Sequence, residues 1–365
     1  VKIFTSERDP ACFPDLQSGL DIEVVPPPRP LQSALEGQGI FQKIQERLNR
    51  ESLGTQSALR IKEKLPPDLD ILVCQNDQSY KLCLPYKRLR PEAKTVWIMN
   101  NAPFRHTRKS SFIVNILSLL ASWLEVLRVR RYIAGIDLVV VNDLEQKKIF
   151  SEKVGGRAVV LNIPVDFEKF HAPIKKISRE DPISLLGIGA LSPARKFEDI
   201  IQAASGLKKK GYRVKVTLVC KNFWKNEDYK KFLLALSKKE ELEKEVVFMF
   251  EGATEIELAH IIQTSHFFVF PNHVRIGSMA AFEAMASGVP LLVSSSTSVA
   301  ESLTDGENAL FFPPGAIDQI QEKIIRAIEN PSFYARVAES GQRFVKENLS
   351  WDKYIADFLR GANSS

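Results

Sequence analysis

Two cations stand where a strand-like run gives way to a predicted helix. Arg195 and Lys196 follow the run that begins at Gly187 and contains Gly189, and they precede the helical pattern that begins at Phe197. A cation at a helix N-terminus opposes the helix dipole, so it is stabilised when an anion lies between it and the free backbone amides. A diphosphate would satisfy this arrangement. The alternative is an arginine–lysine pair exposed to solvent at a turn, and the local pattern leaves both interpretations open.

A second stretch places a carboxylate among small residues. Gly277 and Ser278 can form a tight turn that opens a helix, whose free amides can bind a sugar or a phosphate. Glu283 follows within that helix, where its carboxylate can accept hydrogen bonds from ribose hydroxyls. Gly288 can end the helix as a C-cap, and Pro290 prevents it from continuing. The alternative is a surface glutamate, which fits poorly because the small apolar neighbours of Glu283 indicate a buried face.

Short apolar runs alternate with longer helical patterns along the whole chain. Strands are predicted at 1–5, 22–25, 71–73, 95–99, 138–141, 158–163, 184–188, 215–219, 246–250, 267–270, 291–293 and 309–312. Helices are predicted near 38–63, 111–134, 143–153, 197–209, 225–241, 255–264, 279–286, 316–329 and 332–346. This alternation predicts an α/β protein with two parallel sheets, each between layers of helices. Ligand sites in such folds lie at the carboxyl ends of the strands.

The length of 365 residues predicts about two domains. We expect a first domain over 1–165, a proline-containing linker over 166–182 and a second domain over 183–348. A C-terminal helix over 349–365 is expected to cross back to the first domain. A hydrophobic fraction of 44% and a charged fraction of 26% are typical of a globular chain and exclude a disordered or collagen-like one.

The cysteines and the apolar runs bear on the compartment. Cys12, Cys74, Cys83 and Cys220 form no CxxC pair, which argues against a disulfide scaffold or zinc ribbon and fits a reducing cytosol. Val1 opens into a strand-like run and not into a signal peptide. The longest uncharged apolar stretch, 112–124, is thirteen residues, too short to span a bilayer. We expect a cytoplasmic protein, either free or peripheral at the inner face of the membrane.

The positive charge is concentrated in one region. The net charge is +6, but residues 81–131 hold eleven cations and two acids, so the rest of the chain is net negative. Such a patch fits nucleic acid, anionic lipid or a pyrophosphate-bearing substrate. It flanks an apolar helical pattern over 112–127 that contains Trp123, which indicates either a helix in a membrane interface or an ordinary core helix with solvated ends. No nucleic-acid motif is present, so no nucleic-acid partner is expected.

The second half carries a family resemblance. The residues Pro271, Gly277, Glu283-Ala284-Met285-Ala286, Gly288 and Pro290 resemble the donor-binding signature of retaining GT-B glycosyltransferases, the group 1 or family 4 type. The stretches 189–203 and 300–315 resemble the phosphate-binding turn and a further block of that family. The resemblance covers about 184–360 and is weaker in the first half.

The resemblance implies an activity and a fold. It implies a transferase that moves a sugar from a nucleoside-diphosphate sugar to an acceptor, with retention of configuration. It implies two Rossmann-like domains that face a cleft, no catalytic metal, and no cofactor beyond the nucleotide sugar as co-substrate. The acceptor would be a sugar, a polysaccharide or a lipid-linked sugar. Independently of the resemblance, the basic charge over 81–131 allows contact with an anionic membrane surface as one of its interpretations.

The resemblance also implies roles for particular residues. Arg195 and Lys196, beside Gly189, would neutralise the leaving diphosphate, and Glu283 would bind the ribose. The amides of the turn would hold the donor phosphate and sugar: Gly277, Ser278 and Met279.

Three positions depart from the family pattern. Arg275 stands where the family has a glutamate that contacts the donor sugar, so the identity of the donor is in question. Ala190 stands where an arginine often contacts phosphate. The family often has a histidine near the reaction centre of the first domain, a place that Asn100 or the loop residue His106 would take; a lone loop histidine can equally be plain surface.

The start of the chain resembles the second strand of the family fold. Residues 1–10 fit that strand, so we expect a first domain that lacks its first β-α unit, through either truncation or rearrangement. Two other classes stay open beside the transferase. One is a catalytically degenerate nucleotide-sugar-binding protein, and the other is a nucleotide-sugar epimerase.

Overall fold

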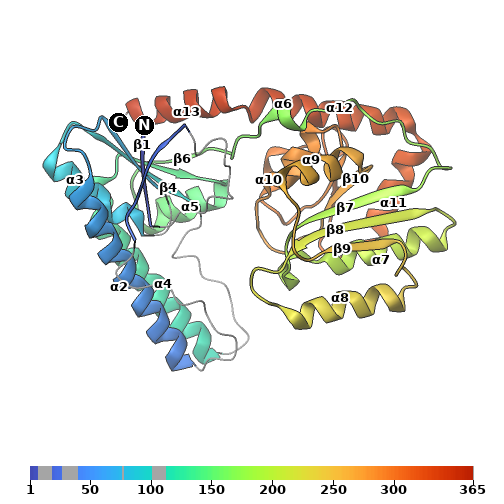
Figure 1. Cartoon of the computed structure of the whole chain (residues 1–365), viewed down its shortest axis with the longest axis horizontal. Coiled ribbons are helices and arrows are strands. Elements are labelled where there is room, and N and C mark those ends of the chain that lie inside the picture. Colours follow the sequence, from blue (N-terminus) through green and yellow to red (C-terminus); the bar gives the residue numbers. More distant parts are fainter. Residues whose placement is uncertain (7–18, 27–39, 76–77, 101–111, 365) are drawn as a thin grey trace. The chain divides into compact units, whose positions relative to one another are not determined.

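The computed structural model describes residues 1–6, 19–26, 40–75, 78–100 and 112–364. The chain divides into two compact units (Figure 1). Unit 1 is Val1–Asn162 together with Asp357–Ser365, and unit 2 is Ile163–Ala356. Each unit is built around its own parallel sheet.

Unit 2 contains a six-stranded parallel sheet in the order β9-β8-β7-β10-β11-β12. The strands are β7 Ile183–Ala190, β8 Val214–Lys221, β9 Val246–Met249, β10 Phe267–Phe270, β11 Leu291–Ser294 and β12 Leu310–Phe312. From β7 the chain adds β8 and β9 toward one edge of the sheet, and from β10 it adds β11 and β12 toward the other edge. This is the Rossmann order, with its switch point between β7 and β10.

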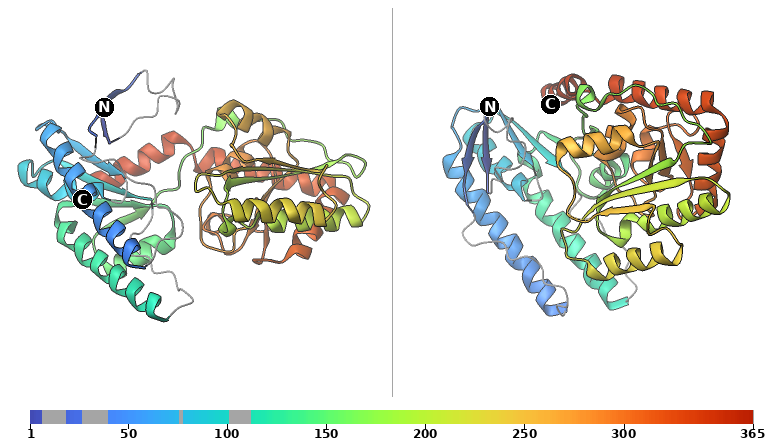
Figure 2. Two further views of the ribbon diagram at one scale, coloured as in Figure 1. Left: turned by 60° about the horizontal axis from the view of Figure 1, so that its bottom comes forward. Right: turned by 45° about the vertical axis from the view of Figure 1, so that its right-hand side comes forward.

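Helices cover both faces of this sheet (Figure 2). They are α7 Phe197–Lys209, α8 Glu227–Lys239, α9 Glu255–Thr264, α10 Met279–Ala286, α11 Ile317–Glu329 and α12 Pro331–Asn348. Successive strand residues supply the two layers alternately: Phe267 lies in the core shared with α7, α8 and α11, and Phe268 in the core shared with α9 and α10. A strand buried on both faces explains the continuous apolar run over 267–270.

The segment that we expected to be a linker packs on unit 2. It contains the short helix α6 Phe167–Phe170, and the side chains of Phe170 and Ile177 are buried in the two cores of that unit. Just before it, the backbone amide of Val165 donates to the carbonyl of Leu349, 2.8 Å away. Its prolines and charges suggested an independent linker, but its apolar side chains attach it to the second sheet.

Unit 1 contains a four-stranded parallel sheet in the order β3-β4-β5-β6. Its strands are β3 Ile71–Gln75, β4 Lys94–Met99, β5 Leu138–Val141 and β6 Ala158–Val160. Its helices are α2 Ile40–Lys64, α3 Cys83–Leu89, α4 Phe112–Tyr132 and α5 Leu144–Lys153, with 3-10 turns at Ser79–Leu82 and Ile133–Gly135. Trp97 is fully buried at the centre of the core, with its ring 4.7 Å from that of Tyr80.

The first two strands form a separate small sheet. We expected β1 Lys2–Thr5 and β2 Asp21–Val24 to belong to the sheet of the first domain, but within the described residues they pair in parallel only with each other. Neither strand has a fully buried side chain, so neither carries the apolar surface that a central strand buries. Glu23 instead pairs with Lys2 and Lys64 at the surface. The described residues therefore form three sheets where the sequence predicted two, because β1 and β2 make a sheet of their own.

The C-terminal helix α13 Trp351–Asn363 ends in unit 1. Ala362 is buried with Val96, Leu138 and Val140 of the first sheet. Gly361 lies so close to β5 that an added Cβ would stand 3.0 Å from the side chain of Leu138. Close packing of small residues thus holds the end of the chain against unit 1.

Candidate functional site

The strand order of unit 2 defines where a ligand is expected. In open parallel sheets the crevice lies outside the carboxyl ends of the two strands at the switch point, here β7 and β10. Gly189, Arg195 and Lys196 come at or just after the end of β7, and Arg275 to Met279 follow β10. The structure therefore brings the two sequence stretches together at one edge of the sheet.

Arg195 is a cation without an acidic partner. It ends the 3-10 turn Pro193–Arg195, and its guanidinium lies 5.8 Å from the ring centre of Phe270. Among the described residues its side chain makes no ion pair or hydrogen bond, and burial lowers its pKa. An added Cβ on Gly189 would lie 3.0 Å from the Arg195 side chain, so a larger residue at position 189 would displace that side chain slightly. A half-buried guanidinium with free donors at this point is suited to an anion.

Lys196 has a different environment. Its backbone is left-handed, with a φ of 55°, and it joins the 3-10 turn to α7. Its ammonium lies 3.3 Å from the Oε1 of Glu198. The Oε2 of the same carboxylate accepts from the hydroxyl of Tyr229. The charge of Lys196 is thus compensated by Glu198, whereas Arg195 has no acidic partner among the described residues.

The turn after β10 is built as a helix cap. Ser278 is the N-cap of α10, and its Oγ accepts from the amide of Ala281 at 3.2 Å. The next residue, Met279, is half-exposed, and a Cβ added to Gly277 would stand 3.6 Å from the Oγ of Ser298. The cap uses one of the first amides of α10, and the others at this terminus have no helical partner.

Glu283 faces inward from the second turn of α10. Burial raises the pKa of its carboxyl to about 7, although the nearby charge of Lys169 opposes the shift. The side chain has no hydrogen-bond partner among the described residues. A carboxylate that is short of donors is suited to accept hydrogen bonds from a diol.

Arg275 is held by a carboxylate from the neighbouring loop. It forms an ion pair with Glu301, which lies in the 3-10 turn Val299–Ser302 after β11. Both side chains are mostly buried. The family glutamate is replaced by Arg275, but a carboxylate is still present beside position 275, because Glu301 supplies one.

Two polar groups at this edge were missed from the sequence. The Nε2 of His273 lies 2.8 Å from the Oδ2 of Asp199 in the first turn of α7. Asn272 is fully buried, and neither atom of its side-chain amide has a hydrogen-bond partner among the described residues. Their position directly after β10 is the signal that could have identified them.

Asn100 and His106 belong to unit 1. Asn100 directly follows β4, and its carbonyl accepts from the side chain of Asn142 at 3.3 Å. His106 lies outside the described residues. Asn100 therefore occupies the carboxyl end of a first-unit strand, as its expected role requires.

The described residues contain neither a metal-binding cluster nor a membrane-spanning helix. No group of three or more His, Cys, Asp or Glu side chains within it is arranged to hold a metal ion. None of its helices is both long enough and apolar enough to cross a membrane.

The basic region 81–131 is partly neutralised by its own contacts. Lys81 is buried and donates to Thr55 at 2.8 Å, Lys87 pairs with Asp137 at 2.8 Å, and Arg90 pairs with Glu92. Arg105, Arg108 and Lys109 lie outside the described residues. Several cations of the predicted basic patch therefore stabilise the fold of unit 1, and contact of this patch with a membrane surface stays a prediction.

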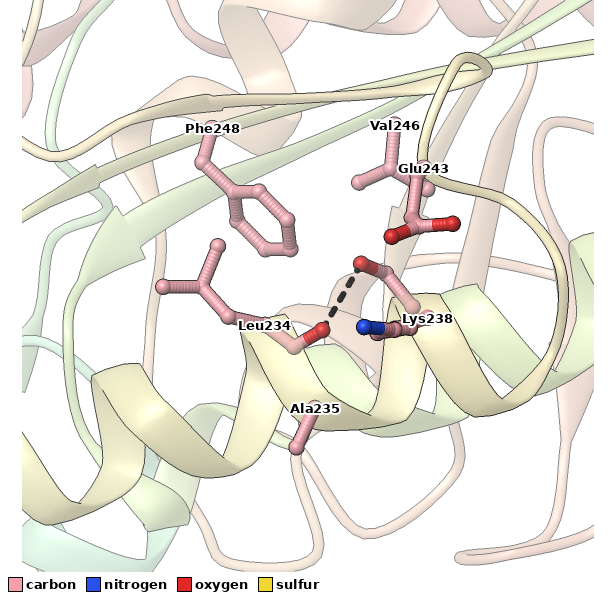
Figure 3. A pocket seen from close by; sticks show the side chains of 7 residues that line it. Leu234, Ala235, Lys238, Glu243, Val246 and Phe248 are labelled. Atoms are coloured by element: carbon pink, nitrogen blue, oxygen red, sulfur yellow. Dashed lines mark hydrogen bonds between the residues drawn. The ribbon is translucent and has the colours of Figure 1, made fainter.

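A groove of about 470 Å³ lies elsewhere in unit 2, between α8 and β9 (Figure 3). Its lining is mostly apolar, with one cation and one acid: Leu234, Ala235, Ser237, Lys238, Glu243, Val246 and Phe248. Ser237 is occupied by a hydrogen bond to the carbonyl of Leu234. None of the predicted site residues lines this groove, so it does not compete with the switch point as the candidate site.

Residues 169–344 match the family described as glycosyl transferases group 1. The matched segment spans 176 of the 365 residues of this chain and is similar to a group 1 glycosyltransferase domain. It contains Arg195, Arg275, Glu283 and the turn at 277–279, so the site described above lies within the matched region.

Two curated relatives are similar over part of this chain. One is the MMP alpha-(1->4)-mannosyltransferase of Mycolicibacterium hassiacum, 28% identical over 113 residues that cover 31% of this chain and 28% of the relative. The other is the capsular polysaccharide biosynthesis glycosyltransferase CapM of Staphylococcus aureus, 20% identical over 236 residues, with 59% and 58% covered. The chain thus spans about a quarter to under six-tenths of the length of these relatives.

Solved structures share the fold at low identity. Anabaena HepE in complex with UDP and glucose has a TM-score of 0.73 at 15% identity, covering 100% of this chain and 92% of that one. Sucrose-phosphate synthase from Thermosynechococcus elongatus has a TM-score of 0.68 at 13% identity, covering 92% and 82%. These neighbours are GT-B glycosyltransferases, so the predicted α/β, GT-B fold class is confirmed.

Proposed function

We propose that this protein is a glycosyltransferase that moves a sugar from a nucleoside-diphosphate sugar to a carbohydrate acceptor. The proposal is supported by the group 1 domain, by the GT-B fold and by the side chains at the switch point of unit 2. The observation that carries it is the half-buried Arg195, whose positive charge has no acidic partner among the described residues.

Arg195 would act on the leaving group. When the bond between the sugar and the diphosphate breaks, negative charge develops on the diphosphate, and a preorganised cation in a poorly solvated place lowers the barrier. The amides at the start of α10 would contribute from the other side of the switch point, because Ser278 caps only one of them. Lys196 would act mainly by shaping the turn that holds Arg195, since its ammonium is bound by Glu198.

Glu283 would bind the ribose. Burial raises the pKa of its carboxyl, and the nearby charge of Lys169 only partly opposes this shift. Two ribose hydroxyls would donate to the carboxylate and favour its ionised form. This gives the nucleotide two attachment points, an anion-binding arginine and a diol-binding glutamate.

The finer features of the reaction extend this proposal. We infer retention of configuration from the signature over 271–290, and metal independence because Arg195 and backbone amides can stabilise the diphosphate without a cation cofactor. One relative is named for capsular polysaccharide biosynthesis, which favours a sugar or polysaccharide acceptor over other nucleophiles; a lipid-linked sugar has the same reacting hydroxyl. Asn100, at the carboxyl end of β4 in the first unit, stays a predicted site residue.

A second candidate is a nucleotide-sugar-binding protein without transferase activity. The observation that favours it is the ion pair between Arg275 and Glu301, which engages both side chains next to the turn that would hold the donor. Ala190 adds to this candidate because it cannot contact phosphate.

Calorimetric titration of the full chain with nucleoside diphosphates tests the common part of both candidates. We expect binding, and we expect Arg195→Ala to weaken it by about 10- to 100-fold, since a hydrogen-bonded charged group contributes about 1.5 to 3 kcal/mol. Arg343→Ala is the matched control, because Arg343 lies in α12 and its guanidinium donates to the hydroxyl of Ser340 in the same helix. Equal affinity of the Arg195 variant and the wild-type protein would move the diphosphate elsewhere.

Product analysis separates the two candidates. A transferase releases nucleoside diphosphate from the donor, faster with a carbohydrate acceptor present, and NMR of the glycoside gives the anomeric configuration. Unchanged turnover after chelation supports metal independence. Tight donor binding with no release of diphosphate under any of these conditions would favour the binding protein.

A further inference from the structure

Helix α4 presents an apolar stripe on one side. It consists of six large residues at spacings of three and four, which share a helix face: Ile116, Leu119, Leu120, Trp123, Leu124 and Leu127. Their exposed fractions range from 42% to 59%. The other side of α4 is the one that packs, since Val126 and Val129 lie in the core of unit 1. The stripe is therefore not needed for the core of this unit.

A contiguous apolar stripe of this length needs a partner. Scattered exposed apolar residues are ordinary on protein surfaces, but a continuous patch marks an interaction site. The six residues extend over more than three helical turns, so the partner surface is elongated or planar.

Cations extend the stripe at its C-terminal end. Arg130 and Arg131 follow Leu127 by three and four residues, and both are exposed. The one acid in α4, Glu125, lies on the buried side and pairs with Arg128. The stripe face therefore combines aliphatic side chains, a tryptophan and positive charge, and it carries no carboxylate.

We propose that this face of α4 docks on an anionic lipid bilayer, with the helix lying in the plane of the interface. Apolar side chains would enter the boundary between headgroups and acyl chains, Trp123 would sit at headgroup depth, and Arg130 and Arg131 would contact anionic headgroups. This surface lies in unit 1, and its function does not depend on the activity proposed for unit 2.

Charge favours a bilayer over a second copy of the chain. Two α4 faces packed together would bury their leucines, but neither face offers a carboxylate to the arginines of the other. An anionic bilayer satisfies both the apolar and the charged part of the surface at once. Self-association is nevertheless the rival that the experiment must separate.

Co-sedimentation of the full chain with lipid vesicles tests the proposal. We expect binding to vesicles of equal parts phosphatidylglycerol and phosphatidylcholine, weaker binding to phosphatidylcholine alone, and a loss of the difference at high salt. Leu120→Gln with Trp123→Gln should weaken binding by about 10- to 100-fold, since both side chains lose apolar burial in the lipid. Arg130→Gln with Arg131→Gln should weaken binding to the anionic vesicles by about tenfold and leave binding to phosphatidylcholine unchanged.

A matched variant controls for general loss of exposed apolar surface. Trp224 and Phe232 in unit 2 are about as exposed as Trp123 and Leu120, so Trp224→Gln with Phe232→Gln should bind vesicles like the wild-type protein. Trp123→Phe should keep the affinity and remove the fluorescence shift that vesicles induce. Because the substituted stripe residues are exposed, circular dichroism and melting temperature should stay unchanged in every variant.

Two results would overturn the proposal. The first is a folded wild-type protein that does not sediment with the anionic vesicles. The second is a wild-type dimer, detected by light scattering, that the Leu120 and Trp123 substitutions dissociate while vesicle binding persists; the stripe would then join two copies of the chain.

Discussion

Arg275 and Glu301 form an ion pair across two loops at the carboxyl edge of the second sheet. One loop follows β10 and opens α10, and the other follows β11. The pair offers hydrogen-bond donors and acceptors side by side, which is what the hydroxyls of a neutral sugar require. A carboxylated sugar would instead be repelled by Glu301. This arrangement predicts that the pair senses the sugar and not the nucleotide.

A charge exchange tests that role. Arg275→Glu and Glu301→Arg alone should each weaken binding of the sugar nucleotide by about tenfold or more, because each leaves two like charges in a mostly buried place. The double exchange should recover most of the loss. Calorimetry with the nucleoside diphosphate alone is the internal control and should change little. Equal weakening with and without the sugar would assign the pair to the fold of the loops.

Glu283 predicts a pH dependence of donor binding. Its carboxyl has a pKa of about 7, so only part of the protein carries the ionised form at neutral pH. Ribose hydroxyls donate to that form, so affinity for a nucleotide sugar should rise as the pH increases through 7. The two phosphates of a nucleotide sugar do not titrate in this range, which leaves the protein as the source of the effect. Glu283→Gln should bind more weakly and give a flatter profile; a parallel profile would exclude this carboxyl.

The same carboxyl affects stability with the opposite sign. Its pKa is raised above its ordinary value of 4.5, so between that pH and about 7 the folded state binds more protons than the unfolded state. Its contribution to stability is therefore lost as the pH rises through this window. Urea unfolding at several pH values should show a steeper fall for the wild-type protein than for Glu283→Gln.

Lys196 and Lys225 provide a matched pair of backbone positions. Both are left-handed, with φ values of 55° and 51°, a conformation that glycine adopts at lower cost. Glycine at either position should raise the free energy of unfolding by up to about 1 kcal/mol. At position 196 this gain should be smaller, because the substitution also removes the bond from the Lys196 ammonium to Glu198. If Lys196 also binds diphosphate, only Lys196→Gly should weaken nucleotide binding. Equal nucleotide affinity of the two variants would limit Lys196 to a structural role.

Gly135 fixes the approach of two elements in unit 1. An added Cβ would lie 2.2 Å from the Cα of Leu84 and 2.5 Å from its backbone nitrogen, so α3 would have to move. Gly135→Ala should therefore destabilise the fold by about 3 kcal/mol or more. Gly211→Ala is the comparison: its φ is 84° and nothing lies near its Cβ, so it should cost only about 1 kcal/mol. Similar melting temperatures for the two variants would contradict the close packing of α3.

The sequence was sufficient for elements whose signals are local. The apolar run over 267–270 became β10, and the helix predicted at 279–286 became α10, with Ser278 as its cap and Gly288 just beyond its end. By contrast, α3 and the turn at Ser79–Leu82 were missed. Their short segments hold Tyr80, Cys83 and Tyr86, whose burial is too irregular to give a helical period.

The candidate site also has features that local sequence signals predict and features that they do not. Hydrophobic period, capping residues and the residue types after each strand depend on near neighbours in the chain, so they placed Arg195 just after β7 and Glu283 within α10. Which charges meet depends on residues far apart in the chain. Only the folded arrangement showed that Glu301 binds Arg275 and that α4 turns six apolar side chains outward, because strand order and helix rotation are set by packing across the whole domain.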